Sequence, residues 1–271
     1  MINLGNSDVT LKLGSNDVQT AYLGSTLIYP VSLISDGLVF DFRAEDYTSG
    51  SLIWTSNTGN YTASVTGSVD GGLDYIDGNK VGFDGNHWLQ FDNATTASIS
   101  SSQWQVYALV EFNSSQLLTS SFKPELFSKG DGLSPAWSYA YQGGGINPGF
   151  GFVDGGYSNY LGLTTDNLNP FMTGSKQLFA LTMMTGSTLI AQATTGSFTI
   201  NQYVGTVGNT ISYDTASLVT SFTGSASAPL LFGKSVNNTT TNLSGSVVRL
   251  FAYNRILSSS ERLKNWVYLK S

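Results

Sequence analysis

The sequence contains no cysteine and only one histidine, His87. Without cysteine the chain can form neither a disulfide framework nor a thiolate metal site, and a single histidine excludes zinc sites that need several imidazoles. Stability is therefore expected to come from packing of the core.

Charge is also scarce, because Asp, Glu, Lys and Arg make up only 11% of the chain and the formal net charge is −6. The twelve basic residues are scattered, whereas electrostatic capture of nucleic acid or of an anionic membrane needs them clustered. Hydroxyl and amide side chains must cover most of the surface. Such a composition is typical of β-rich proteins with many turns, often extracellular or virion proteins.

Long apolar runs are missing as well, so no segment reaches the roughly eighteen apolar residues of a membrane span. The first residues have neither the basic nor the apolar region of a secretory signal peptide. We expect a protein that is used without classical export or is released by another route, such as cell lysis with a virus particle.

The sequence does contain enough apolar β-strand segments to form one hydrophobic core. Its 271 residues are 41% hydrophobic, enough for one large domain. Apolar segments of five to eight or so residues are separated by Gly, Ser and Asn turns, with almost no helical pattern. We predict an all-β fold, a two-sheet antiparallel jelly-roll sandwich. The expected strands include residues 37–43, 52–54, 81–92, 105–112, 125–131, 177–184, 229–234 and 247–253.

The stretch of residues 245–266 predicts a buried strand followed by a short helix. Residues 247–253 are nearly all apolar, with Arg249 as the only charge, which favours a central strand covered on both faces. Ser258 and Glu261 have the spacing of a capping box that would start the helix. Strict alternation predicts that one face carries Val248, Leu250 and Ala252 and the other carries Val247, Phe251 and Tyr253.

This closing stretch resembles the end of laminin-G-like (concanavalin A-like) jelly rolls, in which the last long strand leads into a small helix. Other phrases fall in the same family order, including the Phe-Asp-Gly turn at residues 83–85 and the Ser-Lys-Gly-Asp of residues 128–131. The resemblance implies that residues 32–271 form one concanavalin A-like domain.

Residues 1–31 form a separate β-repeat segment. Leu-Gly recurs at Leu4, Leu13 and Leu23, and Ile28 and Tyr29 follow, as three short strands joined by tight turns would require. Three such strands bury too little to fold alone, so we expect these residues to anchor the chain or to drive oligomerisation. The segment resembles N-terminal segments of tailed-bacteriophage structural proteins, which implies other virion proteins as partners; an ordinary β-meander is the alternative.

The carboxylates do not have the spacing of a glycosidase. Laminarinase-type enzymes of this fold use Glu-x-Asp-x-x-Glu on one strand, and glycoside hydrolysis needs a pair of carboxylates at a set separation. The four glutamates, Glu45, Glu111, Glu125 and Glu261, do not form that pattern. His87 has no serine elbow nearby and is interpreted as a turn residue. We therefore expect no catalytic residues and no enzyme activity.

Aromatic residues give candidate sugar contacts, because aromatic faces beside amides stack on sugar rings. Trp137, Tyr139 and Tyr141 alternate along one expected strand, where filling the core is the favoured interpretation. Tyr157, Asn159 and Tyr160 follow a glycine pair in an expected loop and are the better candidates.

Calcium is the one cofactor that the sequence leaves open. Asp131, Asp154 and Asp166 lie on Gly- and Asn-rich segments, and calcium accepts irregular cages of oxygen ligands. Solvated turn aspartates are the favoured alternative, so the expectation is no cofactor.

Two function classes follow. The first is a non-enzymatic bacteriophage virion protein on the particle surface (capsid decoration, head fibre or tail adhesin), assembled in the host cytoplasm as a homo-oligomer and touching neighbouring subunits or host surface glycans, without nucleic acid or membrane insertion. The alternative is a stand-alone carbohydrate-binding protein or glycoside hydrolase of the concanavalin A-like fold. The missing cysteine, the low charge and the N-terminal segment favour the first.

Overall fold

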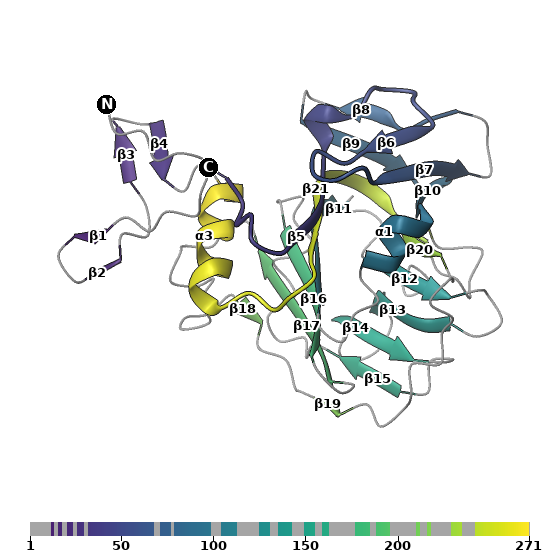
Figure 1. Ribbon diagram of the computed structural model, residues 1–271. Coiled ribbons are helices and arrows are strands. Elements are labelled where there is room, and N and C mark those ends of the chain that lie inside the picture. Colours follow the sequence, from purple (N-terminus) through teal and green to yellow (C-terminus); the bar gives the residue numbers. More distant parts are fainter. Residues whose placement is uncertain are drawn as a thin grey trace.

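The computed structural model consists of two antiparallel sheets packed face to face, with a helix at the C-terminal end (Figure 1). It describes residues 12–13, 16–17, 21–23, 26–29, 32–67, 71–76, 79–98, 104–112, 125–130, 135–142, 149–154, 159–162, 177–184, 188–195, 210–211, 216–217, 229–234 and 242–270. The predicted all-β sandwich is confirmed.

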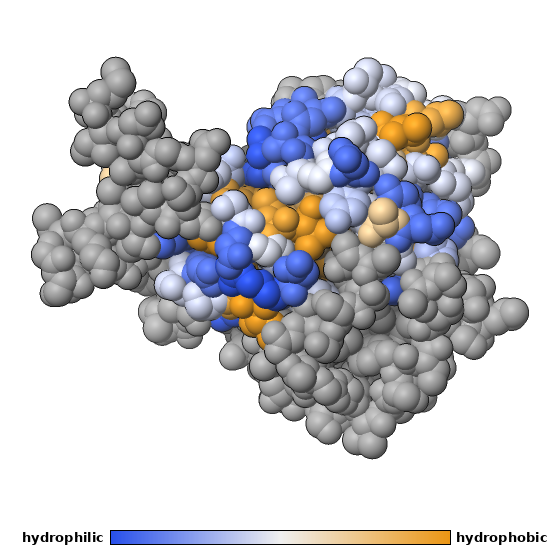
Figure 2. All heavy atoms as spheres, viewed as in Figure 1, coloured by the Kyte–Doolittle hydropathy of each residue, from blue (hydrophilic) through white to orange (hydrophobic). Residues whose placement is uncertain are grey.

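One sheet has eight strands in the order β15-β14-β13-β12-β20-β10-β7-β6. Their bounds are β6 (Ile53–Thr55), β7 (Thr62–Gly67), β10 (His87–Phe91), β12 (Glu125–Gly130), β13 (Pro135–Gln142), β14 (Gly149–Asp154), β15 (Asn159–Gly162) and β20 (Leu230–Phe232). Ile53 of edge strand β6 and Leu52 just before the strand are exposed, at 55% and 58% accessible. Figure 2 shows apolar atoms at the surface in this part of the molecule.

The other sheet has nine strands, of which seven follow the order β18-β17-β16-β11-β21-β9-β8, while β19 pairs with β17 and β5 pairs with β21. Their bounds are β5 (Leu38–Arg43), β8 (Asp74–Ile76), β9 (Lys80–Asp84), β11 (Trp104–Phe112), β16 (Gln177–Met184), β17 (Thr188–Thr195), β18 (Thr210–Ile211), β19 (Ala216–Ser217) and β21 (Ser244–Tyr253). The turn from β9 to β10 contains Gly85 at φ +87°, a conformation that favours glycine.

Strand β21 lies at the centre of the nine-stranded sheet, as predicted. It pairs along one side with β11 and along the other with β9 and then β5. From Leu250 to Tyr253 every residue is fully buried. The expected covering of both faces is confirmed.

The predicted division of β21 into two faces is wrong at Val247 and Val248. Val247 packs in the inner core with Leu250, whereas Val248 packs on the outer face with Phe251. The cause is a β-bulge: Leu109 pairs with Arg249 and Val110 pairs with Val247, so Val248 has no partner on β11. One extra residue reverses the alternation on its N-terminal side.

The inner core fills the space between the two sheets and is rich in aromatic residues. Phe40, Phe42, Phe91 and Trp54 form a connected group with ring centroids 5.4 to 6.0 Å apart, an arrangement that adds to the free energy of area burial. Further along, Phe83, Phe127 and Phe232 pack in the same way. This core holds the sheets together.

A second, outer cluster covers the other face of the nine-stranded sheet. Tyr107 and Phe251 stack at 4.6 Å with their rings nearly parallel, and Tyr253 meets both edge-on. Helix α3 (Ser259–Lys270) lies over this face (Figure 1) and contributes Tyr268 and Leu269 to the cluster.

Asn265 fixes the position of α3. Its Nδ2 donates to the Tyr253 hydroxyl at 2.9 Å, and its Oδ1 accepts from the backbone N–H of Ile34 at 2.8 Å. The Tyr253 hydroxyl in turn donates to the Ile34 carbonyl at 2.9 Å. Asn265 is 1% exposed, so these contacts satisfy polar groups that would otherwise be costly to bury.

The capping box at the start of α3 is confirmed. The Glu261 carboxylate accepts from the backbone N–H of Ser258 at 2.7 Å, and the Ser258 hydroxyl accepts from the backbone N–H of Glu261 at 3.3 Å. The other helical elements within the described ranges are α1 (Asn93–Ser98) and the 3-10 turn η1 (Ala44–Asp46). No helix among the described residues is long and apolar enough to span a membrane.

The N-terminal segment forms two hairpins instead of the expected three strands. They are β1 (Lys12–Leu13) with β2 (Asn16–Asp17) and β3 (Ala21–Leu23) with β4 (Thr26–Tyr29), and their strands pair with no strand of the large sheets. Leu13, Leu23, Ile28 and Tyr29 lie on these strands, while Leu4 lies outside the described residues. Their anchoring role stays a prediction.

Candidate functional site

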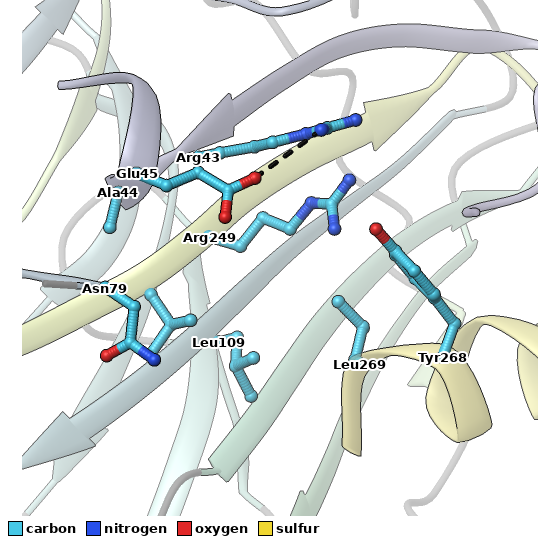
Figure 3. A pocket seen from close by; sticks show the side chains of 9 residues that line it. Arg43, Ala44, Glu45, Asn79, Leu109, Arg249, Tyr268 and Leu269 are labelled. Atoms are coloured by element: carbon cyan, nitrogen blue, oxygen red, sulfur yellow. Dashed lines mark ion pairs between the residues drawn. The ribbon is translucent and has the colours of Figure 1, made fainter. Parts of the chain in front are cut away.

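A pocket of about 230 Å³ opens on the outer face of the nine-stranded sheet, beside the end of α3 (Figure 3). Strand β5 and the 3-10 turn η1 that follows it lie on one side of the pocket. Strands β21 and β11 form its floor, and α3 forms one wall. The lining residues are Arg43, Ala44, Glu45, Asn79, Leu109, Val248, Arg249, Tyr268 and Leu269.

A buried charge cluster lies at one end of the pocket. The register sets Arg43 directly opposite Arg249, and Asp41 opposite Phe251. Two like charges opposite each other repel, and Asp41 relieves this repulsion. One of its oxygens accepts from Arg249 Nε at 2.5 Å, and the other accepts from Arg249 Nη2 at 2.7 Å and from Arg43 Nε at 2.8 Å.

The two arginines differ in how completely they are neutralised. Arg249 is 7% exposed, and although burial opposes its charge, the hydrogen bonds and the charge of Asp41 raise the pKa of its guanidinium above the usual value. The Tyr268 hydroxyl points towards this guanidinium (Figure 3). Arg43 shares Asp41 only through Nε, and its Nη1 lies 3.6 Å from Glu45, a side chain that is 61% exposed.

The remaining lining combines apolar and polar groups. Leu109 and Val248 supply aliphatic floor, and Leu269 adds an aliphatic wall. The planar polar groups of Arg43, Glu45 and Asn79 lie around them (Figure 3). A pocket of this kind can bury the carbon skeleton of a small polar molecule while forked donors and acceptors bind its oxygens.

The predicted sugar contacts lie elsewhere, on the last three strands of the eight-stranded sheet. Trp137, Tyr139 and Tyr141 occupy alternate positions of β13. Asn159 and Tyr160 lie on edge strand β15 instead of in a loop, and their backbones pair with Asp154 and Val153 of β14. Tyr157 lies outside the described residues. The structure thus brings the two groups onto strands separated only by β14.

Two of the calcium candidates, Asp131 and Asp166, lie outside the described residues. Asp154 is the last residue of β14 and pairs with Asn159, so it belongs to a strand and not to a loop. In the described part of the chain, no group of three or more His, Cys, Asp or Glu side chains could hold a metal ion.

The other residues weighed for catalysis have structural surroundings. Glu111 pairs with Lys80 at 2.7 Å, and Glu125 is the first residue of β12. His87 is not a turn residue: it is the first residue of β10, is 6% exposed, and its Nδ1 lies 3.0 Å from Asp84. The interpretation as a turn residue was wrong because the turn ends one residue earlier.

Sequence reasoning missed the pocket, although two signals pointed to it. Asp41 and Arg249 are each a lone charge within an otherwise apolar core segment. A charge in such a position needs a buried partner, and the two are each other's partner. Nothing in the sequence, however, pointed to Asn79, Leu109 or Tyr268, which come from separate segments.

Comparison with known proteins shows the fold. No family model matches the sequence, and a search of curated proteins found no match. Among solved structures, a Trypanosoma rangeli sialidase matches with a TM-score of 0.60 at 15% identity, over 93% of this chain and 36% of the sialidase. The chain thus spans about a third of the sialidase's length.

In two further structures the match covers a larger share of the other chain than it does in the sialidase. Domain 4 of a GH43 extracellular arabinanase from Geobacillus stearothermophilus, in complex with arabinotriose, matches with a TM-score of 0.56 at 17% identity, over 84% of this chain and 97% of that domain. The binding domain of botulinum neurotoxin DC, in complex with rat synaptotagmin II, matches with a TM-score of 0.55 at 11% identity, over 86% of this chain and 51% of the other.

These matches correct the prediction that the chain is not an enzyme. That prediction rested on the missing Glu-x-Asp-x-x-Glu pattern, but the same fold is found in chains of a sialidase and of an arabinanase. Absence of one family's catalytic pattern does not exclude a role in glycan hydrolysis. The comparisons support the β-sandwich, but they give no support to the laminin-G-like assignment or to a bacteriophage link.

Proposed function

We propose that this chain is a carbohydrate-binding domain, and that the pocket beside α3 receives a sugar unit of a glycan. The observation that carries the proposal is the lining of the pocket, in which planar polar groups surround an aliphatic floor. The likeness to arabinanase domain 4, which is in complex with arabinotriose, supports the same class of ligand.

Sugars fit this lining for a physical reason. Neighbouring hydroxyls of a sugar ring each donate and accept hydrogen bonds, so they suit the fork of a guanidinium, the two oxygens of a carboxylate and the amide of Asn79. The C–H faces of the ring pack on aliphatic and aromatic surface, here Leu109, Val248 and Tyr268. Both requirements are met within one pocket.

Calorimetric titration with arabino-oligosaccharides tests the proposal. We expect saturable binding to the parent chain, and Asn79→Ala and Tyr268→Ala should each weaken it about tenfold, as the loss of one hydrogen-bonding or stacking contact would. Gln90→Ala is the matched control, because Gln90 is exposed on the opposite sheet. Analysis of the products by mass spectrometry in the same samples would detect hydrolysis.

The rival location is the β13–β15 end of the eight-stranded sheet, where Asn159 and Tyr160 lie on edge strand β15 and Trp137, Tyr139 and Tyr141 lie two strands away on β13. Asn159→Ala and Tyr160→Ala belong in the same titration. Binding that survives Asn79→Ala and Tyr268→Ala but is lost in these two variants would move the sugar site to that edge.

A further inference from the structure

The charge cluster at the end of the pocket holds more positive than negative charge. Asp41 accepts three hydrogen bonds from two arginines, and its side chain is 1% exposed. One buried carboxylate neutralises one guanidinium. The second positive charge belongs to Arg43, which is the more exposed arginine of the two, with its side chain 27% accessible.

Arg43 also has hydrogen-bonding capacity that its described neighbours do not use. Nε donates to Asp41. The nearby Glu45 carboxylate lies 3.6 Å from Nη1, beyond a hydrogen bond. A guanidinium carries five N–H donors in a fixed fork, so the terminal nitrogens of Arg43 lack a close acceptor within the described part of the chain.

Glu45 supplies only weak compensation for that charge. Its side chain is 61% exposed, and an exposed pair at this separation is worth little because water screens it. Because it is largely exposed and makes no hydrogen bond to Arg43, the Glu45 carboxylate can rotate into solvent. A ligand carboxylate could therefore replace it.

We infer that the pocket selects a sugar carrying a carboxylate, which pairs with the terminal nitrogens of Arg43 while Asp41 holds Arg43 and Arg249 in place. This inference rests on the proposed function. The planar fork of a guanidinium matches a carboxylate with two parallel hydrogen bonds. The nearby Arg249 adds positive potential, and Asn79 and the aliphatic floor remain for the sugar ring.

The test compares an oligogalacturonate with its methyl ester, in which each carboxylate is converted to a neutral ester. The parent chain should bind the acid about tenfold more tightly than the ester, as a charge-assisted pair would give. Arg43→Gln should remove this preference, and Arg43→Lys should keep part of it, since the charge remains but the fork is lost. Thermal unfolding of each variant confirms that the chain still folds.

Glu45→Gln separates this inference from general sugar binding. Removing the competing carboxylate should strengthen binding of the acid about two- to fivefold, as expected for an exposed charge. If Glu45 instead holds sugar hydroxyls, the same change would weaken acid and ester alike. That second outcome would overturn the inference while leaving the proposed function intact.

Several other outcomes of the same titrations would contradict the inference. Equal affinity for acid and ester, no binding of either, or an acid preference that survives Arg43→Gln would each overturn the inference. Inorganic sulfate that displaces the acid at equal concentration would mean a site for any small anion, which also contradicts it. Saturable binding of neutral arabino-oligosaccharides, lost in Asn79→Ala, would still support the proposed function by itself.

Discussion

The two faces of the nine-stranded sheet are both closed, but by different chemistry. The inner face packs on the second sheet through aromatic and aliphatic side chains. The outer face packs on α3 through a stacked aromatic pair, a hydrogen-bonded Asn265 and a cluster of two arginines and an aspartate. The inner face holds the fold together, whereas the outer face also carries a pocket that polar groups keep in shape.

The comparison is tested most severely by Phe251, the aromatic centre of the outer cluster, and Phe42, its inner counterpart. Both are 0% exposed, so Phe251→Ala and Phe42→Ala should each cost about 3 to 5 kcal/mol of unfolding free energy, because each leaves a large cavity. Denaturant titration measures both. A Phe251→Ala chain as stable as the parent would mean that the outer cluster contributes little to the free energy of unfolding.

Asp41→Asn removes the carboxylate from the charge cluster that distinguishes the outer face. The change leaves two arginines without their buried carboxylate, which should cost about 3 kcal/mol, at the low end for breaking a buried pair because the amide still accepts hydrogen bonds. The double variant Asp41→Asn with Arg249→Met restores charge balance and should recover part of the loss. If Asp41→Asn is neutral, the cluster makes no contribution to stability.

Ser258→Ala weakens only the start of α3. Loss of the side-chain half of the capping box should cost about 0.5 to 2 kcal/mol, clearly less than Phe251→Ala. Ser260→Ala is a suitable control, because within the described part of the chain the Ser260 hydroxyl contacts only that of Ser258. Equal losses in the two serine variants would contradict a specific capping role.

Acid should weaken the capping box at the start of α3. The salt bridge with Arg255, together with the hydrogen bonds from Ser258, lowers the pKa of Glu261 from 4.5 to about 2. Because this folded-state pKa is depressed, the stabilisation is complete above about pH 4.5 and is lost as pH falls through 2.

Unfolding free energies of the parent and of Glu261→Gln, measured between pH 6 and pH 2.5, should therefore converge as the pH falls. The variant should be the less stable of the two near neutral pH. A difference that stays constant over that range would show that the Glu261 charge does not contribute.

Deleting residues 1–31 should have the smallest effect on the sandwich. The hairpin strands pair only with each other, so the thermal midpoint of the remaining chain should stay close to that of the parent. We also expect the deletion to abolish any oligomer that the parent forms, measured by light scattering. An unfolded product by circular dichroism would show that these residues belong to the core.

The sequence predicted what local chemistry decides. The apolar run from Leu250 to Tyr253 and the spacing of Ser258 and Glu261 were enough to predict a central strand and a capped helix. The bulge at Val248 was not predictable, because it depends on how β21 pairs with β11. The alternation of side chains along the sequence does not show where one extra residue is inserted into a strand.

The pocket could not be predicted from the sequence for a related reason. Its lining comes from residues 43–45, 79, 109, 248–249 and 268–269, which only the sheet order and the docking of α3 bring together. The aromatic segment of residues 137–160 attracted the functional prediction because its residues are close in sequence. Sites built from distant segments leave at most isolated charges, such as Asp41 and Arg249, as a trace.

The contact of Asn265 with Ile34 brings the two ends of the sandwich together. The backbone N–H of Ile34 lies 2.8 Å from the Asn265 side chain, although 231 positions separate the two residues. A domain whose ends meet can be placed within a loop of a larger protein without stretching that loop. A circular permutant that joins residue 270 to residue 32 through a short linker should therefore keep the native sheets, and the fold is suited to serve as an interchangeable part of multidomain chains.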